Sequence, residues 1–369
     1  MNYFSLIYFL LILYTLISLG LISFVIIYQV YLKHQNNNQQ ANKIKWMLYF
    51  QNSILHPKEG HSLKIEARVW RKLRNIKTLI HFLDAFAAYL NGAHRDKFIQ
   101  VVEFNLHEWI KLGAYYSRKP SLKKAYYASV CNRMPVSKHE NYHVLADLLL
   151  TYLDDPSIYC KENVLKALYH FGLAKPIVSA LHHLSGTRQL HDPKLISDGL
   201  LTYSGDKTEL IEQLYDELPY FQTDYQIALI NFFRLEPAAE ILKDRLITLI
   251  NDHQTNIDLT CAVLRYYTKF PVTAYQSIII ACLEGDEYEL TDWEPRSVAA
   301  SALVSYPSPE TKEALIRSIY SKHWYVRRNS AQALAVLKVP LEELSEVFEG
   351  DDSYAKNQLN YFYRKQVSV

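Results

Sequence analysis

The sequence predicts an all-α protein, in which a single N-terminal transmembrane helix precedes an α-solenoid built of helix pairs. Three observations lead to this prediction. An uncharged apolar run opens the chain, a 31-residue pattern recurs near the C-terminus, and only 10 of 369 residues are glycine. Scarce glycine with 49% hydrophobic residues is typical of helices joined by tight turns rather than of a sheet protein with many glycine turns.

The first element is a membrane anchor over residues 1–32. From Asn2 to Val30 no residue is charged, and about 20 apolar residues are enough to cross a hydrocarbon layer about 30 Å thick. The start of the chain is uncharged and no small-x-small cleavage site follows, so we expect an uncleaved anchor. Nothing basic precedes the run except the amino terminus, and three lysines follow it. The positive-inside rule therefore predicts a single-pass cell-membrane protein with its N-terminus outside and its solenoid in the cytoplasm.

Residues 33–62 form the second predicted segment, a juxtamembrane polar and basic spacer. The stretch Gln35–Gln40 cannot bury apolar surface and shows no helical period. Such composition is typical of a flexible linker. The folded part is expected to begin with a basic helical region, residues 63–138, and to continue as a repeat array, residues 139–369.

The charge distribution divides the chain. Residues 33–138 contain 19 Lys and Arg against 6 Asp and Glu, whereas residues 139–369 contain 21 against 32. Basic groups near an anionic leaflet each contribute about 1 kcal/mol of attraction. We therefore expect the basic half to contact the lipid surface, and an ordinary solvated helix face remains the alternative for any single residue. The predicted membrane-surface patch consists of Lys33, Lys43, Lys45, Arg68, Arg71, Lys72, Arg74 and Lys77. No nucleic-acid-binding motif accompanies this charge, so we expect no nucleic-acid partner.

The four cysteines lie in apolar helical contexts without any CxxC or other metal-ligand spacing. They are predicted to be buried free thiols, as suits a reducing compartment. They are Cys131, Cys160, Cys261 and Cys282.

Internal repeats support the solenoid. The segment 293–303 aligns with 324–334 at a constant offset of 31 residues, with Trp, Arg, paired small residues and Ala-Leu in register. Weaker copies of the second-helix pattern end near Leu168, Leu200, Ile230 and Leu264. A fixed period of this length indicates stacked units that bury their apolar faces against their neighbours.

These segments resemble the HEAT-repeat family, in particular its short bacterial variety of about 30 residues per repeat. The resemblance is specific at residues 290–338 and weaker before them. It implies an α-solenoid that binds proteins on its curved surface, with no catalytic residues and no cofactor. The repeat-motif residues are Trp293, Arg296, Trp324, Arg327 and Arg328, and the resemblance implies a structural ladder of polar contacts for Arg296 and Arg327.

A competing pattern is HExxH at residues 139–143. On a helix it would place His139 and His143 on one face for zinc, with Glu140 as general base. Glu162 follows at the spacing that resembles the third ligand of gluzincin aminopeptidases. The companion features of that family are missing, and a solvated helix face explains the pattern, so the zinc site is kept only as the alternative.

The sequence thus predicts a membrane-anchored cytoplasmic interaction scaffold with an unidentified protein partner. Membrane-anchored bacterial HEAT proteins can serve as accessory components of membrane synthases, so the resemblance makes an accessory subunit of a membrane complex, such as a polysaccharide glycosyltransferase, one possible role. No cofactor and no catalytic residue are expected. The alternative is a membrane-bound zinc metallopeptidase using His139, His143 and Glu162 as ligands.

Overall fold

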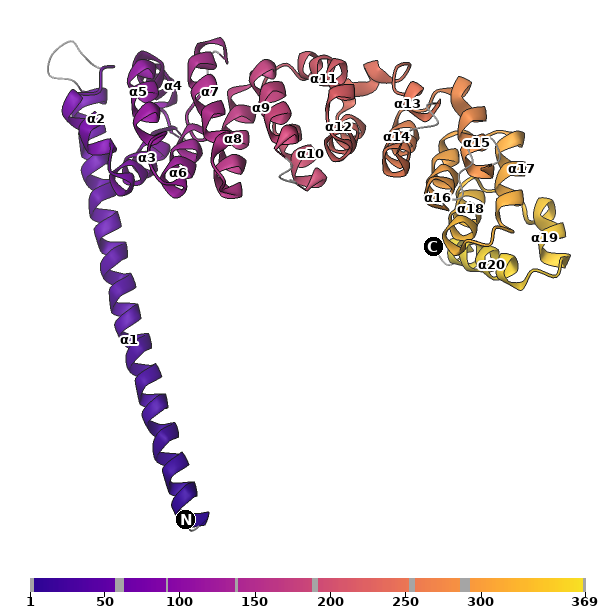
Figure 1. Ribbon diagram of the computed structural model, residues 1–369, viewed down its shortest axis with the longest axis horizontal. Coiled ribbons are helices and arrows are strands. Elements are labelled where there is room, and N and C mark those ends of the chain that lie inside the picture. Colours follow the sequence, from indigo (N-terminus) through magenta and orange to yellow (C-terminus); the bar gives the residue numbers. More distant parts are fainter. Residues whose placement is uncertain are drawn as a thin grey trace. The chain divides into compact units, whose positions relative to one another are not determined.

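A computed structural model describes residues 3–56, 63–90, 92–136, 139–187, 192–251, 256–285 and 293–367 (Figure 1). Every regular element in these ranges is a helix, and they contain no strand. The all-α prediction is therefore confirmed. The chain divides into two compact units, unit 1 over Met1–Ala167 and unit 2 over Leu168–Val369.

Unit 1 begins with α1, a single α-helix over Tyr3–Phe50 (Figure 1). Within it an 18-residue stretch reaches a mean hydropathy of 2.4, and by length and composition the helix can cross a membrane. Its large apolar side chains are exposed between Tyr8 and Leu32. The prediction of a flexible spacer at Gln35–Gln40 is wrong, because α1 runs through this stretch without a break.

The end of α1 packs into the core of unit 1, which explains why the helix continues past the polar stretch. Trp46 and Phe50 meet Phe82 at ring-centroid distances of 5.2 and 5.0 Å. Phe50 also contacts Phe86 and Phe98. Tertiary packing of one face is the main source of helix stability in proteins, and these contacts supply it for the last turns of α1.

The remaining helices of unit 1 are short. After α1 come a π-helical turn at Gln51–Leu55, α2 (Ala67–Leu73), α3 (Ile76–Leu90), α4 (Arg95–Phe104), α5 (Leu106–Tyr116), α6 (Ser121–Cys131), a 3-10 turn at His139–Tyr142, α7 (His143–Leu150), a 3-10 turn at Thr151–Asp154, and α8 (Ile158–Phe171), which continues into unit 2.

The structure groups residues 139–167 with the basic region rather than with the repeats that follow. The Tyr152 hydroxyl donates to the Gly113 carbonyl at 2.6 Å, and Lys124 pairs with the buried Asp155 at 2.9 Å. A Cβ on Gly113 would lie 2.6 Å from Leu148, so α5 and α7 approach closely. These contacts cross the predicted boundary at residue 138, because helix packing does not follow the change in charge.

Unit 2 is a stack of helix pairs. Its helices are α9 (Ala174–Gly186), α10 (Pro193–Leu201), α11 (Lys207–Asp216), α12 (Thr223–Leu235), α13 (Thr248–Asn251), α14 (Ile257–Lys269), α15 (Gln276–Glu284), α16 (Trp293–Ala302), α17 (Pro309–Ser318), α18 (Trp324–Val336), α19 (Ser345–Glu349) and α20 (Ser353–Val367). Short 3-10 turns occur at Leu218–Tyr220, Pro237–Leu242, Thr273–Tyr275, Leu303–Ser305 and Leu341–Leu344.

The even-numbered helices of unit 2 form one layer. Contacts join α10 to α12 and continue pair by pair through α14, α16 and α18 to α20. In the second layer α9 contacts α11, and α15 contacts α17. Each pair thus buries its apolar stripe against the next one, which is the packing expected of a helical repeat array.

Local sequence explains where several of these helices begin. The side chains of Asp192, Asp206 and Asn256 each accept a hydrogen bond from the first turn of the following helix. Ser308 does the same for Thr311, and Pro309 follows it at the first helical position. These residues satisfy backbone N–H groups that have no partner within the helix.

Buried tyrosines link successive helices in both units. Their hydroxyls donate to backbone carbonyls of other elements, at 2.9 Å from Tyr116 to Leu73, 2.6 Å from Tyr127 to Trp109, 3.0 Å from Tyr203 to Gly172, and 2.7 Å from Tyr266 to Ala239. Each ring fills the core while its hydroxyl pairs a carbonyl.

Candidate functional site: a basic cleft in unit 1 and an aromatic ladder in unit 2

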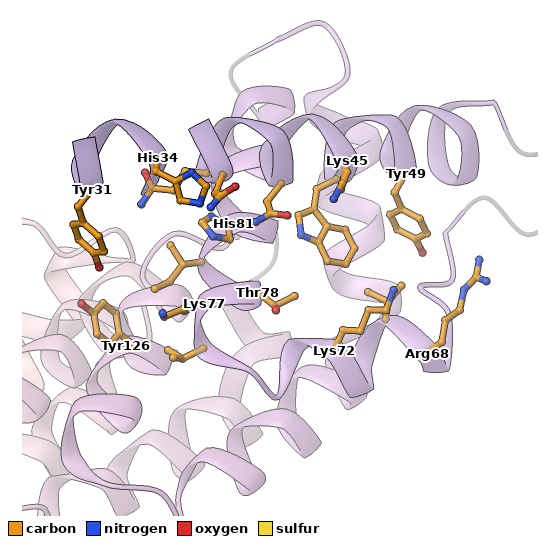
Figure 2. A pocket seen from close by; sticks show the side chains of 17 residues that line it. Tyr31, His34, Lys45, Tyr49, Arg68, Lys72, Lys77, Thr78, His81 and Tyr126 are labelled. Atoms are coloured by element: carbon orange, nitrogen blue, oxygen red, sulfur yellow. The ribbon is translucent and has the colours of Figure 1, made fainter. Parts of the chain in front are cut away.

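A cleft of about 1100 Å³ lies in unit 1 between α1 and the helices that follow it (Figure 2). We call it the basic cleft. One wall is the part of α1 that follows the apolar run, and the other comes from α2, α3 and α6. Its lining residues are Tyr31, His34, Asn38, Gln39, Asn42, Lys45, Trp46, Tyr49, Arg68, Val69, Lys72, Ile76, Lys77, Thr78, Ile80, His81 and Tyr126.

The α1 wall explains the polar stretch that the sequence analysis interpreted as a spacer. Asn38, Gln39 and Asn42 line the cleft. Together with the lining residues before and after them, they recur at intervals of three or four residues, the spacing of one helix face. This period over residues 31–49 is a signal by which sequence alone could have identified the wall. The sequence analysis missed this period because the residues between the lining positions are also Asn and Gln, so the lining face does not differ in polarity from its neighbours.

Cations dominate the charge of the cleft. Lys45, Arg68, Lys72 and Lys77 line it together with two histidines, and no carboxylate does. Arg68 pairs with Glu66 at 2.5 Å. The three lysines form no ion pair with any residue that the structure describes.

The labelled side chains are ordered along the cleft in Figure 2. Tyr31 faces Tyr126 at one end, and Arg68 lies near the other end. His34 and His81 follow the tyrosines. The tyrosine end is the end nearest the apolar run of α1, which ends where Lys33 supplies its first charge.

At the Arg68 end of the cleft, side-chain hydrogen bonds hold the backbone in place. The Asn105 side chain accepts a hydrogen bond from the Ile65 N–H at 3.0 Å and donates to the Leu63 carbonyl at 2.6 Å. Trp70 donates to the Ile65 carbonyl at 3.2 Å. These bonds hold the segment that leads into α2. Burial is the largest cause that raises the pKa of Tyr49 above its ordinary value, so its hydroxyl stays neutral at physiological pH.

The structure separates the predicted basic patch into two sets. Four of its members line the cleft: Lys45, Arg68, Lys72 and Lys77. Lys33 and Lys43 lie on α1 outside the lining, and Arg71 is exposed on α2. Arg74 packs over the Tyr115 ring, 5.2 Å from its centroid. The sequence thus identified the region of positive charge but not which of its residues share a concave surface.

A second candidate surface lies in unit 2, where aromatic residues at the starts of three successive stacked helices meet. Trp293 of α16 stacks on Tyr325 of α18 at 4.7 Å, and Trp324 meets Tyr325 edge-on at 4.9 Å. The Arg328 guanidinium lies over Trp324 at 5.3 Å, and that of Arg327 over Tyr354 of α20 at 5.1 Å. We call these six residues the aromatic ladder.

The ladder is accessible although its members contact one another. Trp324, Tyr325 and Tyr354 are 46%, 48% and 67% exposed. Single exposed aromatic side chains are ordinary, but here several exposed rings adjoin one another, and contiguous exposed apolar patches mark interaction sites.

The predicted repeat-motif arginines also support the backbone. Arg296 donates from Nε to the Leu283 carbonyl at 2.9 Å, and Arg327 donates to the Ser321 carbonyl at 3.0 Å. Each bond ties a second helix to the chain that precedes it. Asn329 adds hydrogen bonds to the Ser297 carbonyl and hydroxyl at 2.9 and 2.8 Å, which join α18 to α16.

The HExxH residues are not arranged on one α-helix. His139 and Glu140 lie in a 3-10 turn, and His143 is the first residue of α7. Glu162 lies in α8. No group of three His, Cys, Asp or Glu side chains in the described residues is placed to hold a metal ion. The ligand set proposed for the zinc alternative, His139, His143 and Glu162, is therefore not assembled.

The cysteine prediction agrees with the structure. Cys131, Cys160, Cys261 and Cys282 are buried and free. Burial raises the pKa of Cys160 and of Cys261 to about 11.

Comparisons of the chain with profiles of protein families, with curated proteins and with solved structures give no match.

Proposed function

We propose that this protein is a membrane-anchored scaffold, held in the bilayer by α1, that binds a protein partner through unit 2. The proposal includes the orientation inferred from the flanking lysines, with the N-terminus outside the cell and both units in the cytoplasm. The proposal also assigns the repeats of this chain to the HEAT family.

The aromatic ladder is the observation that carries this proposal. Trp, Tyr and Arg are the residue types most enriched where alanine substitution weakens protein–protein binding. Here they are combined on neighbouring repeats at Trp324, Tyr325 and Arg328, with rings partly exposed and stacked. Stacking fixes their geometry, so little side-chain entropy is lost when a partner covers them.

The test is recovery of a partner from native membranes. Full-length chain is cross-linked in its own cells and purified by affinity, beside a variant with Trp324→Ala, Tyr325→Ala and Arg328→Ala. The matched control replaces exposed side chains elsewhere in unit 2, Tyr220→Ala and Ile241→Ala, which are 75% and 46% exposed.

We expect a specific protein to co-purify with the wild type and with the control variant. Its recovery should fall at least about tenfold with the ladder variant, which corresponds to a loss of about 1.4 kcal/mol or more in binding free energy. Equal recovery with all three chains and with the isolated anchor would contradict the proposal.

A further inference from the structure

We propose that the basic cleft of unit 1 binds the headgroup of an anionic membrane lipid that carries more than one phosphate. This inference rests on the proposed function only through the membrane anchorage of α1, and it does not depend on the partner of unit 2. It goes beyond the general attraction of a basic surface, because it assigns the binding to one concave site.

Position is the first argument. Tyr31, at one end of the cleft, lies within the last turn before the first charged residue, Lys33. When α1 crosses the bilayer, that end of the cleft lies where lipid headgroups begin. Tyr31 and Tyr126 face each other there (Figure 2), and tyrosines are enriched at this level of membrane proteins because one end of the ring is apolar and the other polar.

Charge is the second argument. Lys45, Lys72 and Lys77 share one cleft without a carboxylate in its lining, and the described residues supply no ion-pair partner for them. Like charges in a concave surface repel one another and concentrate a field that attracts anions. Since Glu66 already pairs with Arg68, about three positive charges remain. A ligand with two phosphates compensates them better than one with a single phosphate.

Size and polarity are the third argument. Ligand sites usually enclose roughly 300–1,000 Å³, so a cleft of about 1100 Å³ is far larger than a lone phosphate needs. From residue 31 to residue 49 the α1 wall is about 27 Å long at 1.5 Å per residue. The amides of Asn38, Gln39 and Asn42 line it and supply hydrogen-bond donors for phosphate and hydroxyl oxygens. A headgroup that carries phosphate and hydroxyl groups finds such donors along this wall.

The experiment measures lipid binding by the full chain in dodecyl maltoside micelles, using native mass spectrometry. The probes are phosphatidylcholine, phosphatidylglycerol and cardiolipin, which carry net charges of about 0, −1 and −2. The cleft variant is Lys45→Gln, Lys72→Gln and Lys77→Gln. The matched variant removes the same charge from the same part of the chain outside the cleft, with Lys33→Gln, Lys43→Gln and Arg71→Gln.

We expect affinity to rise from phosphatidylcholine to cardiolipin. The cleft variant should lower cardiolipin affinity at least about tenfold, and the matched variant less than about twofold, since both lose three charges but only one loses the site. Replacing the three cleft lysines with arginine should preserve binding. All three lysines are exposed, so the variants are expected to fold, which circular dichroism checks.

Two results would overturn the inference. Equal losses in the cleft and matched variants would mean that the charge acts as a diffuse surface. Displacement of cardiolipin by glycerol 3-phosphate at similar concentration would assign the cleft to a soluble phosphate ester instead of a lipid. Neither result bears on the aromatic ladder, whose test uses different residues and a different readout.

Discussion

At the residue scale, the interactions that matter most for stability are those that sequence patterns could not reveal. Nothing in the sequence pattern indicates that Lys124 pairs with Asp155, 31 residues later, at 2.9 Å. Likewise, the chain has 29 tyrosines, and nothing in their spacing distinguishes Tyr127, which donates to a carbonyl in the core, from exposed Tyr220. Such pairings depend on which helices pack together.

The Asp155 pair should contribute strongly to the stability of unit 1. Burial acts to raise the pKa of Asp155, but hydrogen bonds from Lys124, the Ser157 N–H and Ser121 together bring it below its ordinary value. Asp155→Ala leaves Lys124 without its partner, so we expect a loss of about 3 kcal/mol in the free energy of unfolding.

Chemical denaturation of the full chain in detergent measures this loss. The control Asp147→Ala removes an exposed carboxylate from α7 and should change stability by less than about 0.5 kcal/mol. Similar values for the two variants would show that the buried pair contributes little.

Buried thiols and phenols should make the protein sensitive to alkali. Burial raises the pKa of Cys261 from 9.0 to about 11 and that of Tyr225 and Tyr363 from 10.0 to about 12. Because these folded-state pKa values are raised, the stabilisation is complete below pH 9 and is lost as rising pH ionises the same groups in the unfolded chain.

Melting followed by circular dichroism at pH 8, 9, 10 and 11 tests this dependence. A loss of about 2 kcal/mol lowers Tm by roughly 3 °C in a chain of this size, and we expect at least this fall between pH 9 and pH 11. A constant Tm over that interval would mean that the unfolded chain ionises no more readily than the folded one.

At the element scale, periodic segments were predicted well and the polar stretch after the membrane segment was not. The repeats at 293–303 and 324–334 correspond to α16 and α18, because alanine and leucine, which recur in both, are strong helix formers. Residues 35–40 have weak helix propensity of their own. They are helical because Trp46 and Phe50, further along α1, pack against Phe82, and this contact depends on residues that are distant in sequence.

A proline substitution distinguishes a continuous helix from a flexible spacer. Asn42→Pro removes a backbone N–H and clashes with the preceding turn, so we expect it to cost about 3 kcal/mol and to speed amide exchange over residues 38–50. Asn42→Ala is the control and should leave both unchanged or slightly improved. A neutral Asn42→Pro would indicate that this part of α1 is not helical in the protein.

At the scale of the whole molecule, composition predicted an all-helical chain, and the uncharged apolar run predicted an N-terminal helix that can cross a membrane. The described residues contain no strand, and α1 is long and apolar enough to cross one. The division at residue 138 did not match the compact units, which meet at Ala167. Charge changes abruptly along the sequence, whereas α7 packs on α5 through Gly113 and Leu148. Neither the basic cleft nor the aromatic ladder was predictable as a site, because each combines residues from several helices.

The proposed orientation can be tested by thiol labelling in intact cells. The four native cysteines are buried, so single cysteines introduced at Asn2 and at exposed Gln332 report on opposite ends of the chain. A membrane-impermeant maleimide should label Asn2→Cys in intact cells and Gln332→Cys only after lysis. The reverse pattern would place the repeats outside the cell.

The unbroken course of α1 has a mechanical consequence. Its apolar run, residues 3–32, is about 45 Å long as a helix. This is longer than a hydrocarbon layer of about 30 Å, and a helix that is too long for the layer fits by tilting. Because Phe50 of the same helix packs in the core of unit 1, a tilt of α1 tilts unit 1 through the same angle. In the proposed membrane-anchored state, bilayer thickness would therefore set the tilt of unit 1 relative to the lipid, and a thinner membrane would bring one of its sides closer to the surface.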